Sequence, residues 1–368
     1  MLNAAATASV FRVEHTARSS LVAHLTKAIV AGMKLAPKRV LAGAVALVTL
    51  GTIGCTSSGS SGSPEPPDTA DVAYDGLLGS ANENLVGPAF SLATAFSYKG
   101  QADESSSLSR EIADGEISPN VFQSLGAPPI RALMPRFTRW YIRYAATSMV
   151  VAYNPASRYA AQFRAIAAGR EPLQNLFLLM AKPRFRLGRL DPGSYAEGRQ
   201  FIFMLELAAA KYHLPSGIVT KILRGPLDAG AASELYVSPY LDPTLQSGKL
   251  DAVGMYRSEA VELHQPYIPL PAGINLGDLT LKDAYARASM TFAGPVTLVG
   301  QPIVLYVTVI GTQNHAAADA FVRYLLTPAG RKLYAQAGYT LLTPAAAGDL
   351  AAIPASISRE LGGSHRAA

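Results

Sequence analysis

The sequence lacks the residues that build covalent or metal frameworks. Cys55 is the only cysteine among 368 residues, so no intrachain disulfide and no cysteine-based zinc or iron–sulfur site can form. The six histidines are scattered without ligand spacing, and neither a Gly-x-Ser-x-Gly nor a His-Glu-x-x-His motif is present. These absences argue against a hydrolase, and we expect a protein that is not an enzyme and carries no cofactor.

A long hydrophobic run is also absent. The apolar run Val40–Leu50 has 11 residues, whereas a membrane-spanning helix needs about 20. Basic residues precede it in Met33–Arg39, and small residues lead to Cys55, before a stretch rich in Ser, Gly and Pro. This pattern resembles a bacterial lipoprotein signal. We therefore predict a signal peptide over 33–54, an acylated Cys55 and a flexible tether over 55–70.

The signal leaves two points open. Thr52 stands three residues before the cysteine, where lipoprotein signals usually carry an aliphatic residue, so a secretory signal without lipidation is the alternative. Residues 1–32 precede the signal and are interpreted as a doubtful extension with Met33 as the true start; the alternative is an unusually long basic region. Either way the pattern predicts the extracytoplasmic face of the cytoplasmic membrane, with more than one acyl chain needed for stable anchoring.

Charge is sparse and nearly balanced outside this leader. The formal net charge of the chain is +6, but residues 1–54 hold six basic residues and one acid, which leaves 26 basic and 25 acidic residues beyond them. No stripe of Lys and Arg with interleaved aromatic residues occurs, so nucleic-acid binding is disfavoured.

The remainder reads as strands alternating with helices, which predicts an α/β fold with largely parallel sheets. Strands are expected over residues 71–74, 120–124, 147–153, 185–190, 251–256 and 303–310. Helices are expected over residues 84–96, 106–114, 129–134, 157–168, 173–181 and 201–210, and over 316–335, where Pro328 divides the segment in two. The pair Ser194 and Glu197 has the spacing of a capping box for the helix that follows.

Several segments contain more specific sequence motifs, which follow one another in a fixed order along the chain. They are Val72–Gly76, Val86–Phe90, Val150–Tyr159, Leu187–Pro192, Phe201–Ala208, Tyr256–Val261, Tyr267–Leu276 and Phe321–Gly330. This collinear set, over roughly residues 70–340, resembles the tungstate/molybdate-binding proteins of ABC transporters. The resemblance implies the two-domain, type II periplasmic-binding-protein fold, with a cleft between the domains and each sheet mostly parallel. It places domain 1 at 71–145 plus 290–345, domain 2 at 146–289 and a C-terminal tail at 346–368.

The resemblance also implies a site. Asp191 and Glu259 match the two carboxylates that bind tungsten or molybdenum of the oxyanion directly, and Ser105 matches a serine that holds it from a helix N-terminus. A carboxylate beside a dianion is repulsive unless the acid is protonated or its oxygen becomes a metal ligand. On the sequence alone, Asp191 could instead shape the turn before Pro192, and Glu259 could be a surface acid.

The chain departs from the family pattern at three places. Leu77 stands where the family has its first serine and offers only its backbone N–H, so Ser80 is a substitute ligand, with a capping box to Glu83 as the alternative. Leu190 replaces a threonine, and the acids Asp103 and Glu104 precede Ser105. Thr147 and Ser148 are further candidate donors, although a plain strand explains them too.

The sequence thus favours a monomeric, lipid-anchored receptor that captures tungstate or molybdate and presents it to the permease and ATPase subunits of an ABC importer. A receptor for another oxyanion or a small organic anion, an envelope hydrolase and a vestigial binder with a protein partner are the alternatives.

Overall fold

The computed structural model describes residues 69–224, 235–236, 241–291, 296–311 and 316–362. The expected signal peptide, Cys55, the extension over 1–32 and the tether up to residue 68 lie outside these residues. The tether ends earlier than expected, because Thr69 and Ala70 already belong to the first strand. Residues Pro64–Ala368 form one compact unit.

The first sheet has six strands in the order β13-β4-β12-β3-β1-β2. They are β1 (Thr69–Asp75), β2 (Ser97–Asp103), β3 (Val121–Leu125), β4 (Trp140–Ala146), β12 (Val304–Val309) and β13 (Thr340–Gly348). The strands β2 and β3 run parallel to β1, whereas β12 runs antiparallel to both β3 and β4, and β13 runs antiparallel to β4.

The second sheet has five strands in the order β7-β6-β8-β5-β9. They are β5 (Met149–Tyr153), β6 (Leu187–Leu190), β7 (Leu235–Tyr236), β8 (Ala252–Tyr256) and β9 (Tyr267–Pro269). The strand β6 is parallel to β7 and β8, while β5 is antiparallel to β8 and β9. A hairpin of β10 (Ser289–Thr291) and β11 (Thr297–Val299) follows.

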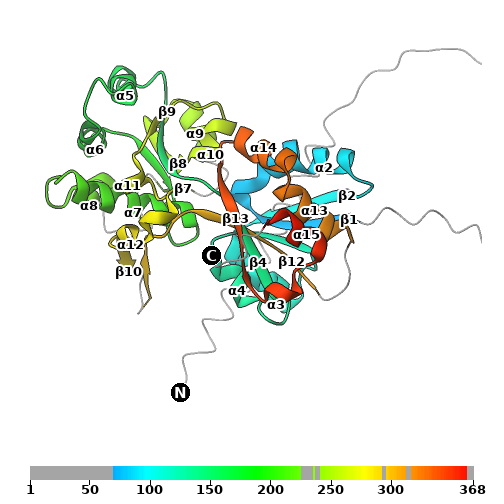
Figure 1. Ribbon diagram of the computed structural model, residues 1–368. Coiled ribbons are helices and arrows are strands. Elements are labelled where there is room, and N and C mark those ends of the chain that lie inside the picture. The colour runs from blue at the N-terminus through cyan, green and yellow to red at the C-terminus, as the bar shows by residue number, and fades with distance from the viewer. Residues whose placement is uncertain (1–68, 225–234, 237–240, 292–295, 312–315, 363–368) are drawn as a thin grey trace, which may run out of the picture. The chain divides into compact units, whose positions relative to one another are not determined.

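Helices cover both sheets (Figure 1). Around the first lie η1 (Gly76–Leu78), η2 (Ala81–Val86), α2 (Gly87–Ala93), α3 (Ser105–Asp114), α4 (Pro128–Ala132), α13 (Ala316–Leu326), α14 (Pro328–Gln336), η4 (Leu350–Ala352) and α15 (Ala355–Glu360). With the second lie α5 (Ala160–Ala167), α6 (Gln174–Met180), α7 (Ala196–Lys211), α8 (Ile218–Leu223), α9 (Leu241–Gln246), α10 (Arg257–Glu262), α11 (Ala272–Asn275), η3 (Leu279–Leu281) and α12 (Lys282–Tyr285). No described helix is long and apolar enough to cross a membrane.

The predicted two-domain α/β fold is confirmed, and the predicted strands and helices are present with ends shifted by a few residues. The sheets are mixed rather than mostly parallel, because the chain passes directly from β4 of the first sheet to β5 of the second and returns through β12 against β3. The residues set apart as a tail include the end of β13 and helix α15, in which Ile357 is fully buried.

Both predicted capping boxes are wrong. Helix α7 begins at Ala196, and the hydroxyl of Ser194 donates to Asp191 Oδ2 instead of capping the helix. The hydroxyl of Ser80 makes no cap bond, and Glu83 Oε1 accepts hydrogen bonds from the hydroxyls of Tyr74 and Tyr98. In both places side-chain hydrogen bonds replace the expected bond to a backbone N–H.

A buried ring of hydrogen bonds fixes the first sheet to its helices. Asn82 Nδ2 donates to Gln123 Oε1 at 2.8 Å, Gln123 Nε2 donates to the Tyr334 hydroxyl at 2.8 Å, and that hydroxyl donates to Asn82 Oδ1 at 2.9 Å. Tyr144 joins the ring as a second acceptor for Gln123 Nε2. All four side chains are buried, so the ring ties η2, β3, β4 and α14 together where an unpaired polar group would be costly.

Candidate functional site: an acidic hollow lined from both sheets

A hollow of about 390 Å³ is lined by residues at and just after the ends of strands of both sheets. The first sheet contributes the ends of β1, β2 and β3, and the second contributes the ends of β6 and β8. The lining residues are Asp75, Gly76, Leu77, Ala102, Asp103, Glu104, Leu125, Leu190, Tyr195, Ala196, Glu197, Tyr256 and Glu259. A concave site where strand ends meet helix N-termini is the usual ligand position in folds of this kind.

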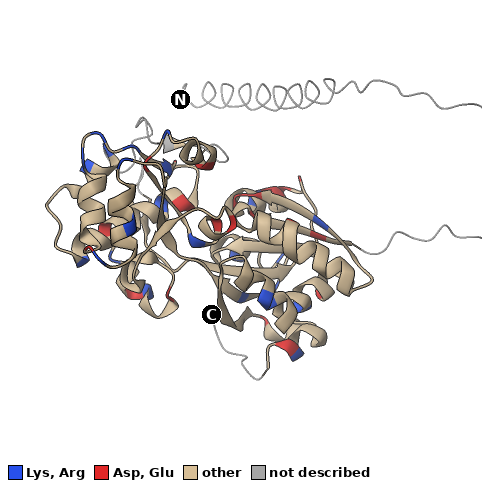
Figure 2. Cartoon of the chain, turned by 90° about the horizontal axis from the view of Figure 1, so that it is seen from above, with Lys and Arg blue, Asp and Glu red and all other residues tan. Residues whose placement is uncertain are grey.

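The charges of the hollow have one sign. Among the lining residues that the structure describes, five are acids and none is Lys, Arg or His. Along the rest of the described chain, acidic and basic residues are interspersed (Figure 2). Like charges gathered in a concave, partly buried space raise the cost of ionising each of them, so some of these acids must hold protons near neutral pH.

The first acidic pair joins Glu197, in the first turn of α7, to Glu259, in the first turn of α10. Their carboxyl groups are hydrogen-bonded to each other. Burial, followed by the nearby charge of Asp242, raises the pKa of Glu259 to about 8. Burial and the Glu259 charge raise the pKa of Glu197 well above its usual range. The pair therefore shares at least one proton at neutral pH.

The Tyr256 hydroxyl is the unpaired polar group of the hollow. The residue is 2% exposed, and its hydroxyl has no hydrogen-bond partner among the described residues. Burial and the acids around it raise the pKa of this hydroxyl well above its usual range, so it keeps its proton. A buried, unpaired hydroxyl costs about 1–3 kcal/mol unless a ligand or water pairs with it.

Asp75 occupies the N-terminus of α3. Its Oδ2 accepts a 2.5 Å hydrogen bond from the Ser105 hydroxyl and a 3.1 Å bond from the Ser105 N–H, and its Oδ1 accepts from the Leu77 N–H at 3.3 Å. Ser105 is buried, and its hydroxyl also accepts from the Leu125 N–H. Burial and the Glu104 charge raise the pKa of Asp75 to about 6. An acid of this chain thus uses the donors that the sequence assigns to a bound anion.

Glu104 occupies the N-terminus of α7 in the same way. Its Oε1 accepts a 2.7 Å hydrogen bond from the Ala196 N–H and lies 3.5 Å from Arg199 Nη2. Glu104 precedes α3 on the first sheet, whereas α7 follows β6 of the second. The two helix N-termini of the hollow, which are favourable positions for negative charge, both hold carboxylates of the protein.

The structure brings two of the predicted ligands, Glu259 and Leu77, to the hollow and places Ser105 behind Asp75. Asp191 is not among the lining residues: its Oδ1 accepts from the Gly193 N–H at 3.0 Å and its Oδ2 from the Ser194 hydroxyl at 3.1 Å, which is the turn before α7. Ser80 is also absent from the lining and accepts from Asn84 Nδ2 at 3.1 Å.

The remaining residues singled out in the sequence are Leu190, Thr147 and Ser148, and one of them lines the hollow. Leu190 lines the hollow. Thr147 is buried and is not among the lining residues; its hydroxyl lies 3.1 Å from that of Ser258 and accepts a hydrogen bond from the Ser258 N–H. The backbone carbonyl of Ser148 accepts a hydrogen bond from the Arg257 N–H.

Sequence reasoning missed Glu197, Tyr256 and Asp75 as lining residues. Each had a signal: Tyr256 is the first residue of the motif that contains Glu259, Asp75 lies inside the first family motif, and Glu197 is an acid at the start of the helix that follows Asp191. Among the described residues, no three His, Cys, Asp or Glu side chains are grouped closely enough to hold a metal cation.

Comparison with known proteins places the chain in a family. Residues 72–340 match the bacterial extracellular solute-binding protein family. The chain belongs to this family.

Two curated relatives and one solved structure agree with that placement. An uncharacterized solute-binding protein of Petrotoga mobilis is 28% identical over 245 residues, which cover 64% of this chain and 72% of the relative. The molybdate/tungstate-binding protein WtpA of Thermococcus kodakarensis is 27% identical over 229 residues, which cover 58% of this chain and 63% of WtpA. The periplasmic molybdate-binding protein of Azotobacter vinelandii superposes with a TM-score of 0.50 at 15% identity, covering 74% of this chain and 98% of that one, and supports the fold.

Proposed function

We propose that this protein is the solute receptor of an ABC importer and captures molybdate or tungstate outside the cytoplasmic membrane, to which a lipid at Cys55 anchors it. The observation that carries the proposal is the position of Glu259, a residue of the family motif, in the wall of a hollow lined from both sheets. Membership of the solute-binding family and the likeness to WtpA support the choice of oxyanion.

An acidic hollow can bind a dianion by two routes. A carboxylic acid that holds its proton can donate a hydrogen bond to an anion oxygen. The pair of Glu197 and Glu259 supplies such a proton at neutral pH when the hydrogen bond between the two carboxyl groups is exchanged for one to the anion. Molybdenum(VI) and tungsten(VI) also accept ligands beyond four oxygens, so an ionised carboxylate oxygen can bind the metal. Sulfate and phosphate lack the second route, which makes the acids a basis for discrimination between anions.

Asp191 is the second metal ligand in this proposal. In the described conformation its oxygens accept hydrogen bonds from Gly193 and Ser194, so ligation requires that at least one of these bonds be exchanged for the bond to the metal. The Tyr256 hydroxyl, which has no hydrogen-bond partner among the described residues, is a donor for an oxygen of the bound anion.

Because the hollow is lined from both sheets, a bound anion contacts both, and ligand contacts of this kind stabilise the closed form of two-domain receptors. The closed form of a monomeric receptor is then the species that the permease recognises, and the ATPase subunit drives release.

The test is calorimetric titration of the purified protein with tungstate, molybdate, sulfate and phosphate. We expect tight binding of tungstate or molybdate and loss of at least tenfold in affinity in Asp191→Ala and Glu259→Ala. Binding of none of the four anions, or of sulfate as tightly as tungstate, would contradict the proposal.

A cationic organic solute is a second candidate, because the described lining has five acids and no cation, which matches a positive ligand. Spermidine is a suitable probe in the same titration. Spermidine binding that Glu259→Gln abolishes, together with no response to tungstate, would favour this candidate.

The anchor has a separate test. Cys55→Ala should release the protein from the membrane fraction of the producing cells without changing anion affinity, since Cys55 precedes the compact unit. A membrane-bound Cys55→Ala protein would contradict acylation at this residue.

A further inference from the structure

A second hollow has the opposite charge. It measures about 310 Å³ and is lined by Pro183, Arg184, Phe185, Arg186, Leu187, Arg224, Tyr236, Lys249 and Leu250. Four of these described lining residues are Arg or Lys, and none of them is Asp or Glu. It shares no lining residue with the acidic hollow, so it is a separate feature of the molecule.

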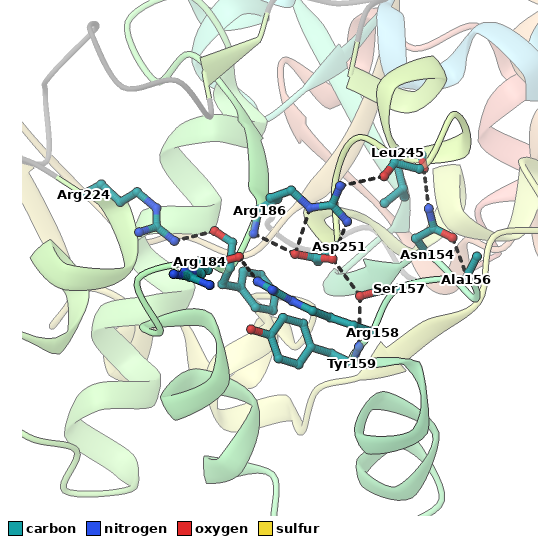
Figure 3. A network of polar contacts seen from close by, with 12 residues as sticks. Asn154, Ala156, Ser157, Arg158, Tyr159, Arg184, Arg186, Arg224, Leu245 and Asp251 are labelled. Atoms are coloured by element: carbon teal, nitrogen blue, oxygen red, sulfur yellow. Dashed lines mark hydrogen bonds and ion pairs between the residues drawn. The ribbon is translucent and has the colours of Figure 1, made fainter.

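Hydrogen bonds to Asp251 and Gly248 hold the Arg186 guanidinium of this basic hollow in place. Its Nε and Nη2 donate to Asp251 Oδ2 and Oδ1 at 3.2 and 2.7 Å, and its Nη1 donates to the Gly248 carbonyl at 2.9 Å (Figure 3). The Asp251 side chain is fully buried and also accepts from the Ser157 hydroxyl. Asp251 therefore balances the charge of Arg186 from inside the protein, while half of the Arg186 side chain stays exposed.

The chain also orients Arg224. This residue ends α8 with a φ of 55°, and its Nη1 and Nη2 donate to the carbonyls of Pro183, Lys182 and Phe185. These carbonyl oxygens fix the direction of the Arg224 guanidinium. Figure 3 shows Arg224 and Arg184 on the same side of the Arg186–Asp251 pair.

The remaining two cations are unengaged. Arg184 and Lys249 are exposed, and no described residue forms a hydrogen bond or ion pair with either side chain. The basic hollow thus combines two oriented guanidinium groups with two cations that are free to close on a ligand. Planar guanidinium groups bind the oxygens of a phosphate in pairs, and lysine adds a point charge.

We propose that this basic hollow binds a phosphate group, either as free phosphate or as the headgroup of an anionic phospholipid. The two sources share one chemistry, in which Arg184 and Lys249 contact the phosphate oxygens while Arg186 and Arg224 hold it from the wall. A phosphate here leaves the acidic hollow open to its own solute. The inference does not depend on what that solute is.

Equilibrium dialysis of the full-length protein in detergent against radiolabelled inorganic phosphate tests the free form. The variant carries Arg184→Gln and Lys249→Gln, and its matched control carries Arg323→Gln and Lys332→Gln, which removes two exposed charges from α13 and α14. We expect at least a tenfold loss of phosphate affinity in the first double variant and none in the control.

Flotation with vesicles tests the lipid form. Binding to phosphatidylcholine vesicles with and without phosphatidylglycerol is compared for the same three proteins, which share any anchor at Cys55. A preference for phosphatidylglycerol that disappears only in the Arg184/Lys249 variant supports a headgroup, and patch-specific phosphate binding without that preference supports free phosphate. The proposal is overturned if neither ligand distinguishes the two double variants. Both changes lie at exposed positions, so equal thermal unfolding of the variants is the expected check on folding.

Discussion

Oε1 of Glu104 accepts a hydrogen bond of 2.7 Å from the N–H of Ala196, the first residue of α7. Glu104 stands directly before α3 on the first sheet, and α7 packs on the second. One carboxylate therefore joins the two halves of the acidic hollow and fills a helix N-terminus that could otherwise hold part of an anion.

Replacing this carboxylate should weaken the junction. We expect Glu104→Ala to lower the free energy of unfolding by about 2 kcal/mol, because a largely buried hydrogen bond to a charged group is lost. Urea unfolding followed by circular dichroism measures the change. Glu116→Ala, at an exposed acid just beyond α3, is the matched control and should leave stability nearly unchanged. Equal midpoints for the two variants would show that the Glu104 contact contributes nothing.

The carboxyl pair makes stability depend on pH. The pKa of Glu259 rises from 4.5 to about 8 on folding, so the folded protein binds more protons than the unfolded chain between these values. The associated stability is fully present below about pH 4.5, falls as the pH rises, and is lost above about pH 8. Thermal unfolding from pH 5 to 9 should therefore show a falling midpoint, and Glu259→Gln should flatten that slope. If the midpoint of Glu259→Gln fell with pH as steeply as that of the wild type, a group other than Glu259 would bind the extra proton of the folded state.

Tyr256→Phe separates binding from folding. The Tyr256 hydroxyl has no partner among the described residues, so its removal should leave stability unchanged or raise it by about 1 kcal/mol. The same change should lower tungstate affinity severalfold, because a ligand donor is lost. Tyr339→Phe is the control: the Tyr339 hydroxyl donates to the Leu77 carbonyl at 2.6 Å, so this variant should lose stability. A destabilised Tyr256→Phe protein with unchanged affinity would contradict the assignment.

The buried ring around Gln123 predicts a large effect at one amide. Gln123→Ala leaves Asn82 Nδ2 without its acceptor and two tyrosine hydroxyls without a donor, and should cost about 3 kcal/mol or more. Chemical denaturation measures it against Gln336→Ala, an exposed glutamine at the end of α14. A cost below 1 kcal/mol would mean that water replaces the amide.

The fold was predictable from the sequence because its elements are local patterns. The apolar run Val150–Tyr153 and the Pro328 break between α13 and α14 depend on neighbours in the chain, and both are present. The strand β4 (Trp140–Ala146) was not anticipated, since its Arg143 interrupts an otherwise buried run. The mixture of parallel and antiparallel strands in each sheet was not predicted either, because the direction of a strand depends on which sheet the chain enters next.

The site was predictable only in part, because hydrogen bonds between distant residues decide it. Ser105 has the sequence of an anion ligand, but Asp75, 30 residues earlier, takes its N–H and hydroxyl. Asp191 belongs to a family motif, yet its oxygens accept from Gly193 and Ser194, which is the turn that sequence reasoning held as the alternative. Glu259 reaches the hollow because α10 starts directly after β8.

Tungstate titration by calorimetry at pH 7 and pH 9 tests the central claim most directly. With Glu259 in the hollow, tungstate should bind at pH 7, bind more weakly at pH 9, where Glu259 is ionised and repels the dianion, and lose at least tenfold in affinity in Glu259→Ala. Glu262→Ala, on the same helix but outside the lining of the hollow, should keep wild-type affinity. Tungstate affinity that is equal in wild type and Glu259→Ala, or an absence of tungstate binding at both pH values, would contradict the account.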